Sequence, residues 1–127
     1  MYWVIIFVVI VMIIWFASRG EVFIVDENTK GEKIMDFQVA GARHYSGKVK
    51  PMDNVLLIPE LNNIYDENAI EILNLSRKQI GYVPKTHNKK VLKEMDRADV
   101  FGKVIAVYSR SSEIHVEILK HIPNKLS

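Results

Sequence analysis

Three short segments of the chain combine basic, aromatic and hydrogen-bonding side chains. Residues 41–48 (GARHYSGK) carry a guanidinium, an imidazole and a phenol between two glycines, residues 62–70 read NNIYDENAI, and residues 81–85 read GYVPK. Aromatic rings stack on nucleic-acid bases with about 1–3 kcal/mol each, and arginine and lysine neutralise phosphates. These residue types predict a surface that can bind a single nucleic-acid strand.

Asp66 does not fit a simple phosphate-binding surface, because its carboxylate would repel phosphate. Beside a nucleic-acid backbone it needs another role, and accepting a hydrogen bond from a terminal sugar hydroxyl would suit it. A purely structural interpretation stays open at this point. Asn-x-Tyr-Asp is ordinary turn chemistry, and Tyr65 and Tyr82 could be core aromatics with a solvated hydroxyl.

The rest of the chain offers no catalytic constellation. It has no cysteine, which excludes a thiol nucleophile, a disulfide and a cysteine-ligated metal. No two histidines share a helical face beside a carboxylate, and Ser46, near His44, lacks an identifiable acid partner. The four histidines, His44, His87, His115 and His121, are scattered along the chain. We therefore expect no enzyme activity, no cofactor and no metal site.

The chain begins with an uncharged hydrophobic run over residues 1–17, and every lysine, arginine, aspartate and glutamate follows Ser18. As a helix this run would be about 25 Å long, near the short end of what crosses a hydrocarbon core. Tyr2 and Trp3 at one end and Trp15 at the other suit the two headgroup levels. The sequence predicts a single transmembrane helix, with the lipid bilayer as the partner of residues 1–17.

Isoleucine and valine in this run also suit a buried strand, but such a strand would need partners on both faces, which a domain this small cannot supply. The other alternative for this run is a cleaved signal peptide. No basic residue precedes it, however, and Trp15 occupies the position where a cleavage site needs a small side chain. Arg19, Lys30 and Lys33 follow the run, so the positive-inside rule places the rest of the chain in the cytoplasm. That part carries the whole net charge of +2, which neither requires nor excludes a phosphate-rich partner.

The remainder of the chain alternates short β-rich runs with turn residues. A β-rich run at 21–26 and a turn at 27–31 precede six expected strands, at residues 37–41, 54–59, 69–75, 79–83, 101–108 and 113–119. One helix of about ten residues should follow Thr86 as its N-cap, with Val91, Leu92 and Met95 on its buried face. These elements predict a mainly β (α+β) fold, a small antiparallel barrel or bent sheet that the helix closes at one end.

The order and spacing of the motifs resemble the HIRAN domain family. The family pattern is a G-x-x-[YH]-Y segment, an apolar strand, an N-x-Y-D-x-N-A-I run and an I-G-[YH]-[LV]-P segment. Here these are GARHY, NVLLIPE, NNIYDENAI and QIGYVP, and the resemblance covers residues 36–119. It implies an OB-like β-barrel with one or two short helices that recognises single-stranded DNA at its free 3′ end.

The resemblance also implies roles for six residues, carried over position by position. Tyr65 would stack on the terminal base and Asp66 would receive the 3′-hydroxyl, while Arg43 and Lys85 would hold phosphates; His44 and Tyr82 complete the set. His44 departs from the tyrosine usual in DNA-binding members. The motor of the eukaryotic members has no counterpart, because the chain contains no P-loop pattern.

The sequence thus predicts four regions: a transmembrane anchor (1–18), a juxtamembrane segment with a possible first hairpin (19–35), a HIRAN-like domain (36–120) and a C-terminal tail (121–127). The expected function is a membrane-tethered, non-enzymatic module that binds single-stranded DNA on the cytoplasmic side. The alternative is a protein-interaction module on the same fold that has lost DNA binding. Salt dependence separates the two, because only phosphate contacts release counterions.

Overall fold

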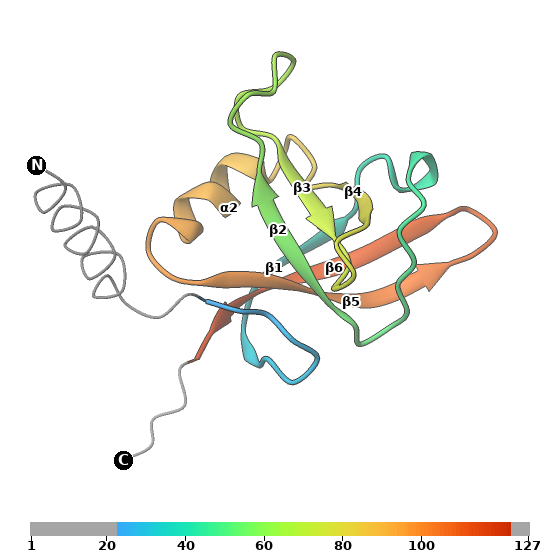
Figure 1. Ribbon diagram of the computed structural model, residues 1–127, viewed down its shortest axis with the longest axis horizontal. Helices are drawn as coiled ribbons and strands as arrows, with labels where there is room; N and C mark the ends of the chain where they lie inside the picture. Colours follow the sequence, from blue (N-terminus) through green and yellow to red (C-terminus); the bar gives the residue numbers. More distant parts are fainter. Residues whose placement is uncertain (1–22, 123–127) are drawn as a thin grey trace, which may run out of the picture.

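The computed structural model describes residues 23–122, which form six strands, one short 3-10 helix and one α-helix (Figure 1). Five of the six predicted strands agree with observed ones within two residues at each end, and the first predicted strand differs more. The elements are β1 (Gly31–Gln38), η1 (Ala42–His44), β2 (Asn54–Pro59), β3 (Ile70–Leu73), β4 (Gln79–Tyr82), α2 (Asn88–Met95), β5 (Val100–Tyr108) and β6 (Glu113–His121).

The start of the described chain differs from expectation. β1 begins at Gly31, inside the segment predicted to be a turn, and residues 23–26 form no strand. Thr29 Oγ1 instead accepts a hydrogen bond from the Asp26 amide at 2.9 Å. Asn54 Nδ2 donates to the backbone oxygens of Asp26 and Thr29 at 2.8 and 3.0 Å. These side-chain bonds give the backbone an alternative to a strand ladder.

No helix within residues 23–122 is long and apolar enough to cross a membrane. The predicted transmembrane helix, residues 1–17, lies outside the described residues and stays a prediction. The same holds for the orientation inferred from its basic flank.

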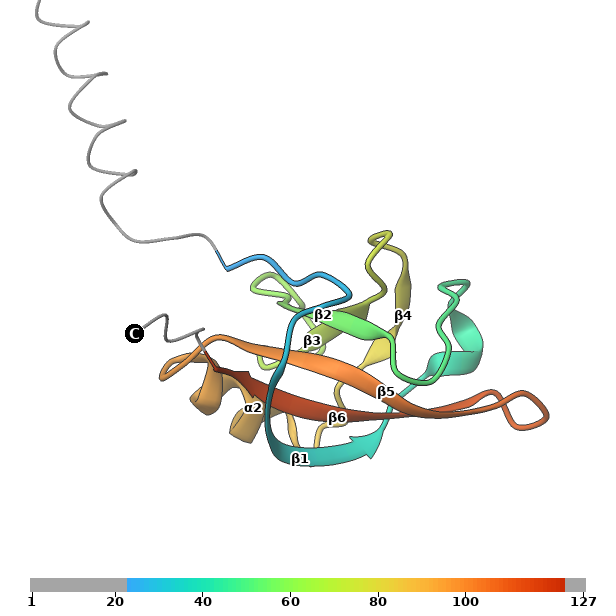
Figure 2. The same cartoon turned by 90° about the horizontal axis from the view of Figure 1, so that it is seen from below.

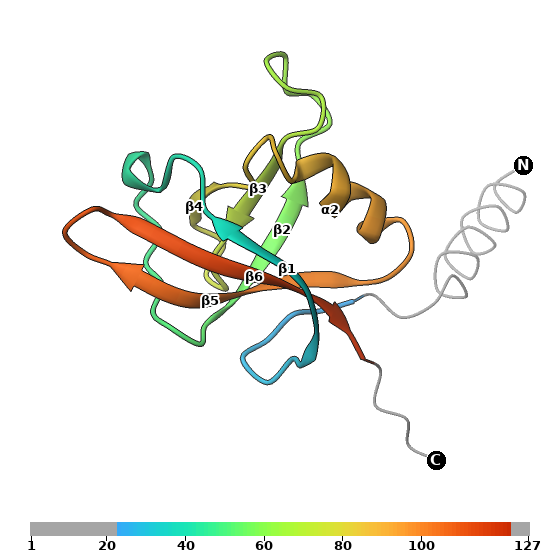
Figure 3. The same cartoon turned by 180° about the vertical axis from the view of Figure 1, so that it is seen from behind.

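All six strands form one antiparallel sheet in the order β1-β6-β5-β2-β3-β4. The sheet bends strongly, so that β2 and β3 run across the long β5–β6 hairpin (Figures 2 and 3). The register shifts between Lys33 and Met35 in β1 and between Val104 and Ala106 in β5. Such bulges bend a strand and increase its twist, which curls the two ends of the sheet toward each other.

The sheet is not closed, which corrects the expected barrel. Beyond the end of β1, Ala40 makes one bridge with Tyr82 of the other edge strand, and their backbones exchange hydrogen bonds of 2.8 and 2.9 Å. Gly41 then adopts a left-handed conformation, with φ of 71°, and turns the chain into η1. No continuous ladder can form beyond that turn. We call this junction between Ala40 and Tyr82 the seam of the OB-like sheet.

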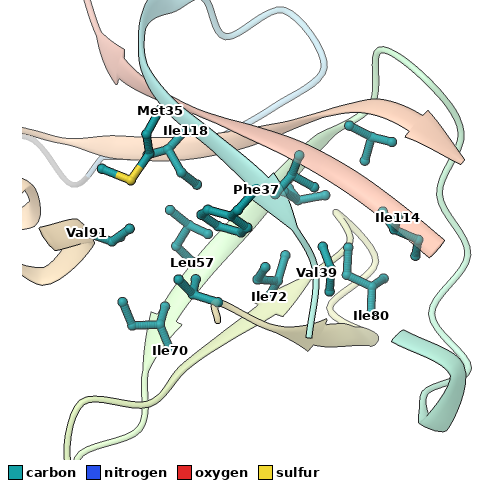
Figure 4. Packing of buried hydrophobic residues seen from close by; sticks show 14 of the residues in the cluster. Met35, Phe37, Val39, Leu57, Ile70, Ile72, Ile80, Val91, Ile114 and Ile118 are labelled. Carbon is teal, nitrogen blue, oxygen red and sulfur yellow. The ribbon is translucent and has the colours of Figure 1, made fainter. Parts of the chain in front are cut away.

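The bent sheet encloses an apolar core (Figure 4). Ile114, Val116 and Ile118 of β6 are buried, which confirms the alternation predicted for this strand. Phe37 of β1 and Ile72 of β3 meet them from other parts of the sheet. The helix α2 covers one end of the core with the side chains predicted for its buried face, Val91, Leu92 and Met95.

The helix α2 begins one residue later than predicted, with His87 and not Thr86 at its N-cap position. The carbonyl of Pro84 accepts hydrogen bonds from the amides of His87 and Asn88 at 2.9 and 3.0 Å, so a turn precedes the helix. The Thr86 hydroxyl is hydrogen-bonded to His87 Nδ1 at 2.8 Å and caps no helix amide.

Candidate nucleic-acid interface

The motif Asn-x-Tyr-Asp lies in a protruding loop, residues 60–69, between β2 and β3 (Figure 1). Asn63 Oδ1 accepts hydrogen bonds from the amides of Tyr65 and Asp66, both at 2.9 Å. Asp66 Oδ1 accepts one from the Asn68 amide at 2.9 Å. Tyr65 is 87% exposed, so it is not a core aromatic. The turn chemistry therefore presents Tyr65 to solvent.

Asp66 also reaches across to the first turn of α2. Its Oδ2 accepts a hydrogen bond from Asn88 Nδ2 at 2.9 Å, and Asn88 is only 2% exposed. A hollow of about 370 Å³ opens beside this pair. Its wall combines an aromatic ring, carboxylates, amides and ammonium groups: Tyr65, Asp66, Glu67, Asn68, Lys85, Asn88 and Lys89. We call this the loop hollow.

Arg43 and His44 lie elsewhere, on the exposed side of η1. They border a second hollow of about 660 Å³, which we call the η1 hollow. His87 lines its far side, with its ring 5.4 Å from that of Phe37, and Ser112 comes from the β5–β6 turn. The rest of its wall includes Gln38, Ala40, Gly41, Pro84, Thr86, Ser111 and Glu113.

The six predicted site residues thus do not share one pocket. Residues 84–88 separate the two hollows: Pro84, Thr86 and His87 face the η1 hollow, while Lys85 and Asn88 face the loop hollow. A strand that used both would cross this segment. The chain between β4 and α2 is therefore the centre of the candidate interface.

Tyr82 lines neither hollow. Its hydroxyl donates a hydrogen bond of 2.7 Å to Glu60 Oε1, and its ring packs edge-on against Tyr45, with the ring centroids 5.9 Å apart. The bond to the Glu60 carboxylate, more than burial, raises the pKa of Tyr82 to about 12. Tyr82 is half-buried, and its hydroxyl already donates a hydrogen bond to Glu60.

Glu60 is a functional candidate that the sequence interpretation missed. Besides the Tyr82 hydroxyl, it accepts a hydrogen bond from Asn63 Nδ2 at 2.8 Å. Burial opposes ionisation of Glu60, but the bonds from Asn63 and Tyr82 outweigh it and lower the pKa of its carboxyl. Burial and the negative charge of Glu60 raise the pKa of the neighbouring Glu71.

Asn88 is the other residue that was missed. It occupies the first position of α2, and no motif in the sequence marked it. Among residues 23–122, no three acidic or histidine side chains gather closely enough to hold a metal ion. Exposed ammonium groups lie on the segment after β4 and on α2, at Lys85, Lys89, Lys90 and Lys93.

These features define a class of protein: a small OB-like β-domain whose aromatic and basic residues line two hollows beside the seam of an open sheet. The family model of the HIRAN domain matches residues 33–126. The chain belongs to the HIRAN domain family, as the motif resemblance indicated.

Curated relatives match over a short segment. The chain is 39% identical to the mouse helicase-like transcription factor over 69 residues, which are 53% of this chain and 7% of that protein. It is 38% identical over 48 residues to a putative SWI/SNF-related matrix-associated actin-dependent regulator of chromatin subfamily A member 3-like 1 of Arabidopsis thaliana, 38% of this chain and 5% of that protein. The match therefore spans a small fraction of these relatives.

Solved structures match over most of the domain. The crystal structure of the HIRAN domain of human HLTF superposes with a TM-score of 0.63 at 26% identity and covers 72% of this chain and 77% of that one. The NMR structure of the HLTF HIRAN domain in its DNA-bound conformation has a TM-score of 0.56 at 24% identity, with coverages of 75% and 81%. A crystal structure from Lactobacillus plantarum has a TM-score of 0.63 at 21% identity, with coverages of 74% and 98%.

Proposed function

We propose that this chain is a non-catalytic DNA-binding module that receives the 3′ end of a single strand in the loop hollow. The observation that carries the proposal is the pairing of an exposed aromatic ring, Tyr65, with an oriented carboxylate, Asp66, in one hydrogen-bonded loop. Family membership supports it, because a solved HIRAN domain is described in a DNA-bound conformation.

The two side chains would share the recognition. The ring of Tyr65 offers a stacking face, a contribution of about 1–3 kcal/mol for one base. A carboxylate has about four lone-pair sites, and Asp66 uses one on each oxygen for Asn68 and Asn88. It can therefore still accept a bond from a 3′-hydroxyl, whereas a 3′-phosphate would bring negative charge against it.

The basic side chains would follow the backbone of the strand. Lys85 and Lys89 border the loop hollow, and Arg43 borders the η1 hollow across residues 84–88. His44, beside Arg43, offers a smaller stacking surface than a phenol ring. Each neutralised phosphate of a single strand contributes about −0.7 to the slope of the logarithm of the binding constant against the logarithm of the salt concentration. Three such contacts predict a slope of about −2.

Binding of a fluorescent oligonucleotide, followed by anisotropy, tests the proposal. The full chain would be purified in a mild non-ionic detergent because of the hydrophobic residues 1–17. A free 3′-hydroxyl should bind at least about tenfold more tightly than a 3′-phosphate, a difference of roughly 1.4 kcal/mol. Asp66→Ala should remove this preference, and Tyr65→Ala should weaken binding of both oligonucleotides. Ile24→Ala, which truncates a residue 74% exposed outside the loop, should change neither.

A protein-interaction module is the second candidate. Leu61 and Ile64 are 88% and 87% exposed beside Tyr65, so the loop tip is unusually apolar. An apolar protein interface would show little salt dependence. Absence of oligonucleotide binding even at low salt would reject the DNA proposal and favour this alternative.

We also propose that residues 1–17 tether the domain to a membrane, with the domain on the cytoplasmic side. The support is the uncharged run and its basic flank. The lack of native cysteine makes the topology easy to test, because Ser111→Cys would be the single thiol of the chain. An impermeant maleimide should label this cysteine only after the cells are permeabilised. Labelling of intact cells would instead show that the domain lies outside the cytoplasm.

A further inference from the structure

Glu60, directly after β2, is at the centre of a chain of hydrogen bonds that ends at the recognition loop. Its two carboxylate oxygens accept bonds from Tyr82 of β4, at 2.7 Å, and from the side-chain amide of Asn63, at 2.8 Å. Asn63 in turn accepts bonds from the amides of Tyr65 and Asp66. We propose that Glu60 is a positioning residue, which orients Asn63 and thereby holds Tyr65 and Asp66 in place for a ligand. This inference rests on the proposed function.

The two ends of an asparagine side-chain amide form different hydrogen bonds. An amide has an NH2 group that only donates and an oxygen that only accepts. Because Glu60 accepts from Nδ2, the oxygen of Asn63 must face the other way, toward the amides of Tyr65 and Asp66. Glu60 thus anchors the NH2 end of Asn63, while the two loop amides bind its oxygen end.

The backbone alone fixes the base of this loop and not its tip. The amide of Glu60 donates to the carbonyl of Ala69 at 2.8 Å, which closes the loop where it leaves the sheet. Nearer the tip, the amide of Asn63 makes a long bond of 3.4 Å to the Glu60 carbonyl. The Asn63 side chain is therefore the main support of Tyr65, whose ring is 87% exposed.

A carboxylate at this position works against binding of an anion. Its charge lies close to the loop that would receive DNA, so removing it should strengthen phosphate binding if electrostatics alone mattered. A positioning role predicts the opposite sign. The direction of the change in affinity therefore separates the two explanations.

The test uses the full chain in a mild detergent and three variants. Glu60→Ala removes the acceptor, while Glu60→Gln keeps the shape and one acceptor oxygen, and its NH2 group can donate to the Tyr82 hydroxyl. Glu32→Ala is the matched control, because it removes an equally negative but exposed side chain from β1. The first readout is amide hydrogen exchange of Tyr65 and Asp66 by NMR, which needs no DNA.

For Glu60→Ala we expect exchange at these two amides to accelerate about tenfold or more, the factor that corresponds to roughly 1.4 kcal/mol. The affinity for a 3′-hydroxyl oligonucleotide should fall by a similar factor, and Glu60→Gln should recover most of both. Unchanged exchange in Glu60→Ala, or tighter DNA binding, would overturn the positioning role. If the wild-type chain bound no DNA, the exchange result would still decide it.

Discussion

Replacing Asp66 by alanine should destabilise the fold in addition to weakening binding. The substitution leaves Asn88, which is 2% exposed, without the acceptor of its 2.9 Å hydrogen bond. A bond to a charged acceptor contributes about 1.5–3 kcal/mol. The bond from the Asn68 amide is less buried, so water can replace it at a cost of about 0.5 kcal/mol. We expect the free energy of unfolding to fall by about 2–3 kcal/mol.

A double-mutant cycle isolates the bond between Asp66 and Asn88. Asn88→Ala leaves a half-buried carboxylate that can turn toward water, so it should cost about 1 kcal/mol. The double variant lacks both side chains, so it leaves no buried amide without a hydrogen-bond acceptor. Its cost should therefore be about 2 kcal/mol, compared with about 3.5 kcal/mol for the sum of the single variants.

Chemical and thermal unfolding of the full chain in detergent, followed by circular dichroism, measures these differences. One kcal/mol shifts the melting temperature of a 60–100-residue domain by about 4–8 °C, so Asp66→Ala should lower it by about 10–20 °C. Additive effects within about 0.3–0.5 kcal/mol would refute the reasoning. The result also sets the temperature at which binding by Asp66→Ala can be measured on folded protein.

Gly81→Ala should lower the free energy of unfolding by about 2–3 kcal/mol, because the new Cβ would lie 2.3 Å from Val39 Cγ1 at a φ of +152°. Gly41→Ala, at a φ of +71° with only ordinary contacts, should lower it by about 1 kcal/mol. Equal losses for the two variants in urea unfolding would contradict this. The pKa of Tyr82 is raised to about 12, against 10.0 for a free tyrosine, so the stabilisation from its hydroxyl should be complete below pH 10 and lost as the pH rises through 12. The free energies of unfolding of the wild type and of Tyr82→Phe should therefore converge at high pH. A difference that stayed constant across this range would argue against the bond to Glu60. Lys85→Ala should make the salt slope of DNA binding shallower by about 0.7, while Lys120→Ala, an exposed lysine of β6, should leave it unchanged.

Periodic segments of the chain were predictable because their pattern reports burial directly. The alternation of Ile114, Val116 and Ile118 identified β6, and the helical spacing of Val91 and Leu92 identified α2. β1 was harder to predict. Its residues pair with β6 from Gly31 to Gln38, and the benefit of that pairing depends on a strand about eighty residues later in the sequence.

The sequence could predict which residues belong to the candidate site, but not how they are arranged in space. The side-chain bonds that organise it, from Tyr82 to Glu60 and from Asn88 to Asp66, each join residues 22 positions apart. Spacing within a motif carries no information about such pairs. The sequence therefore indicated that Tyr82 belonged to the site, but it could not show that the hydroxyl of Tyr82 is directed at Glu60 or that residues 84–88 divide the site into two hollows.

The seam between Ala40 and Tyr82 gives the domain a place where it can open without unfolding. Two hydrogen bonds join the edges of the sheet there, and local opening with few bonds to break has a low free energy. The chain after Ala40 leads into η1, while the chain after Tyr82 leads to the wall between the hollows. A ligand that spanned both hollows would hold the two edges of the sheet together, and we expect hydrogen exchange to slow first at the backbone amides of Ala40 and Tyr82.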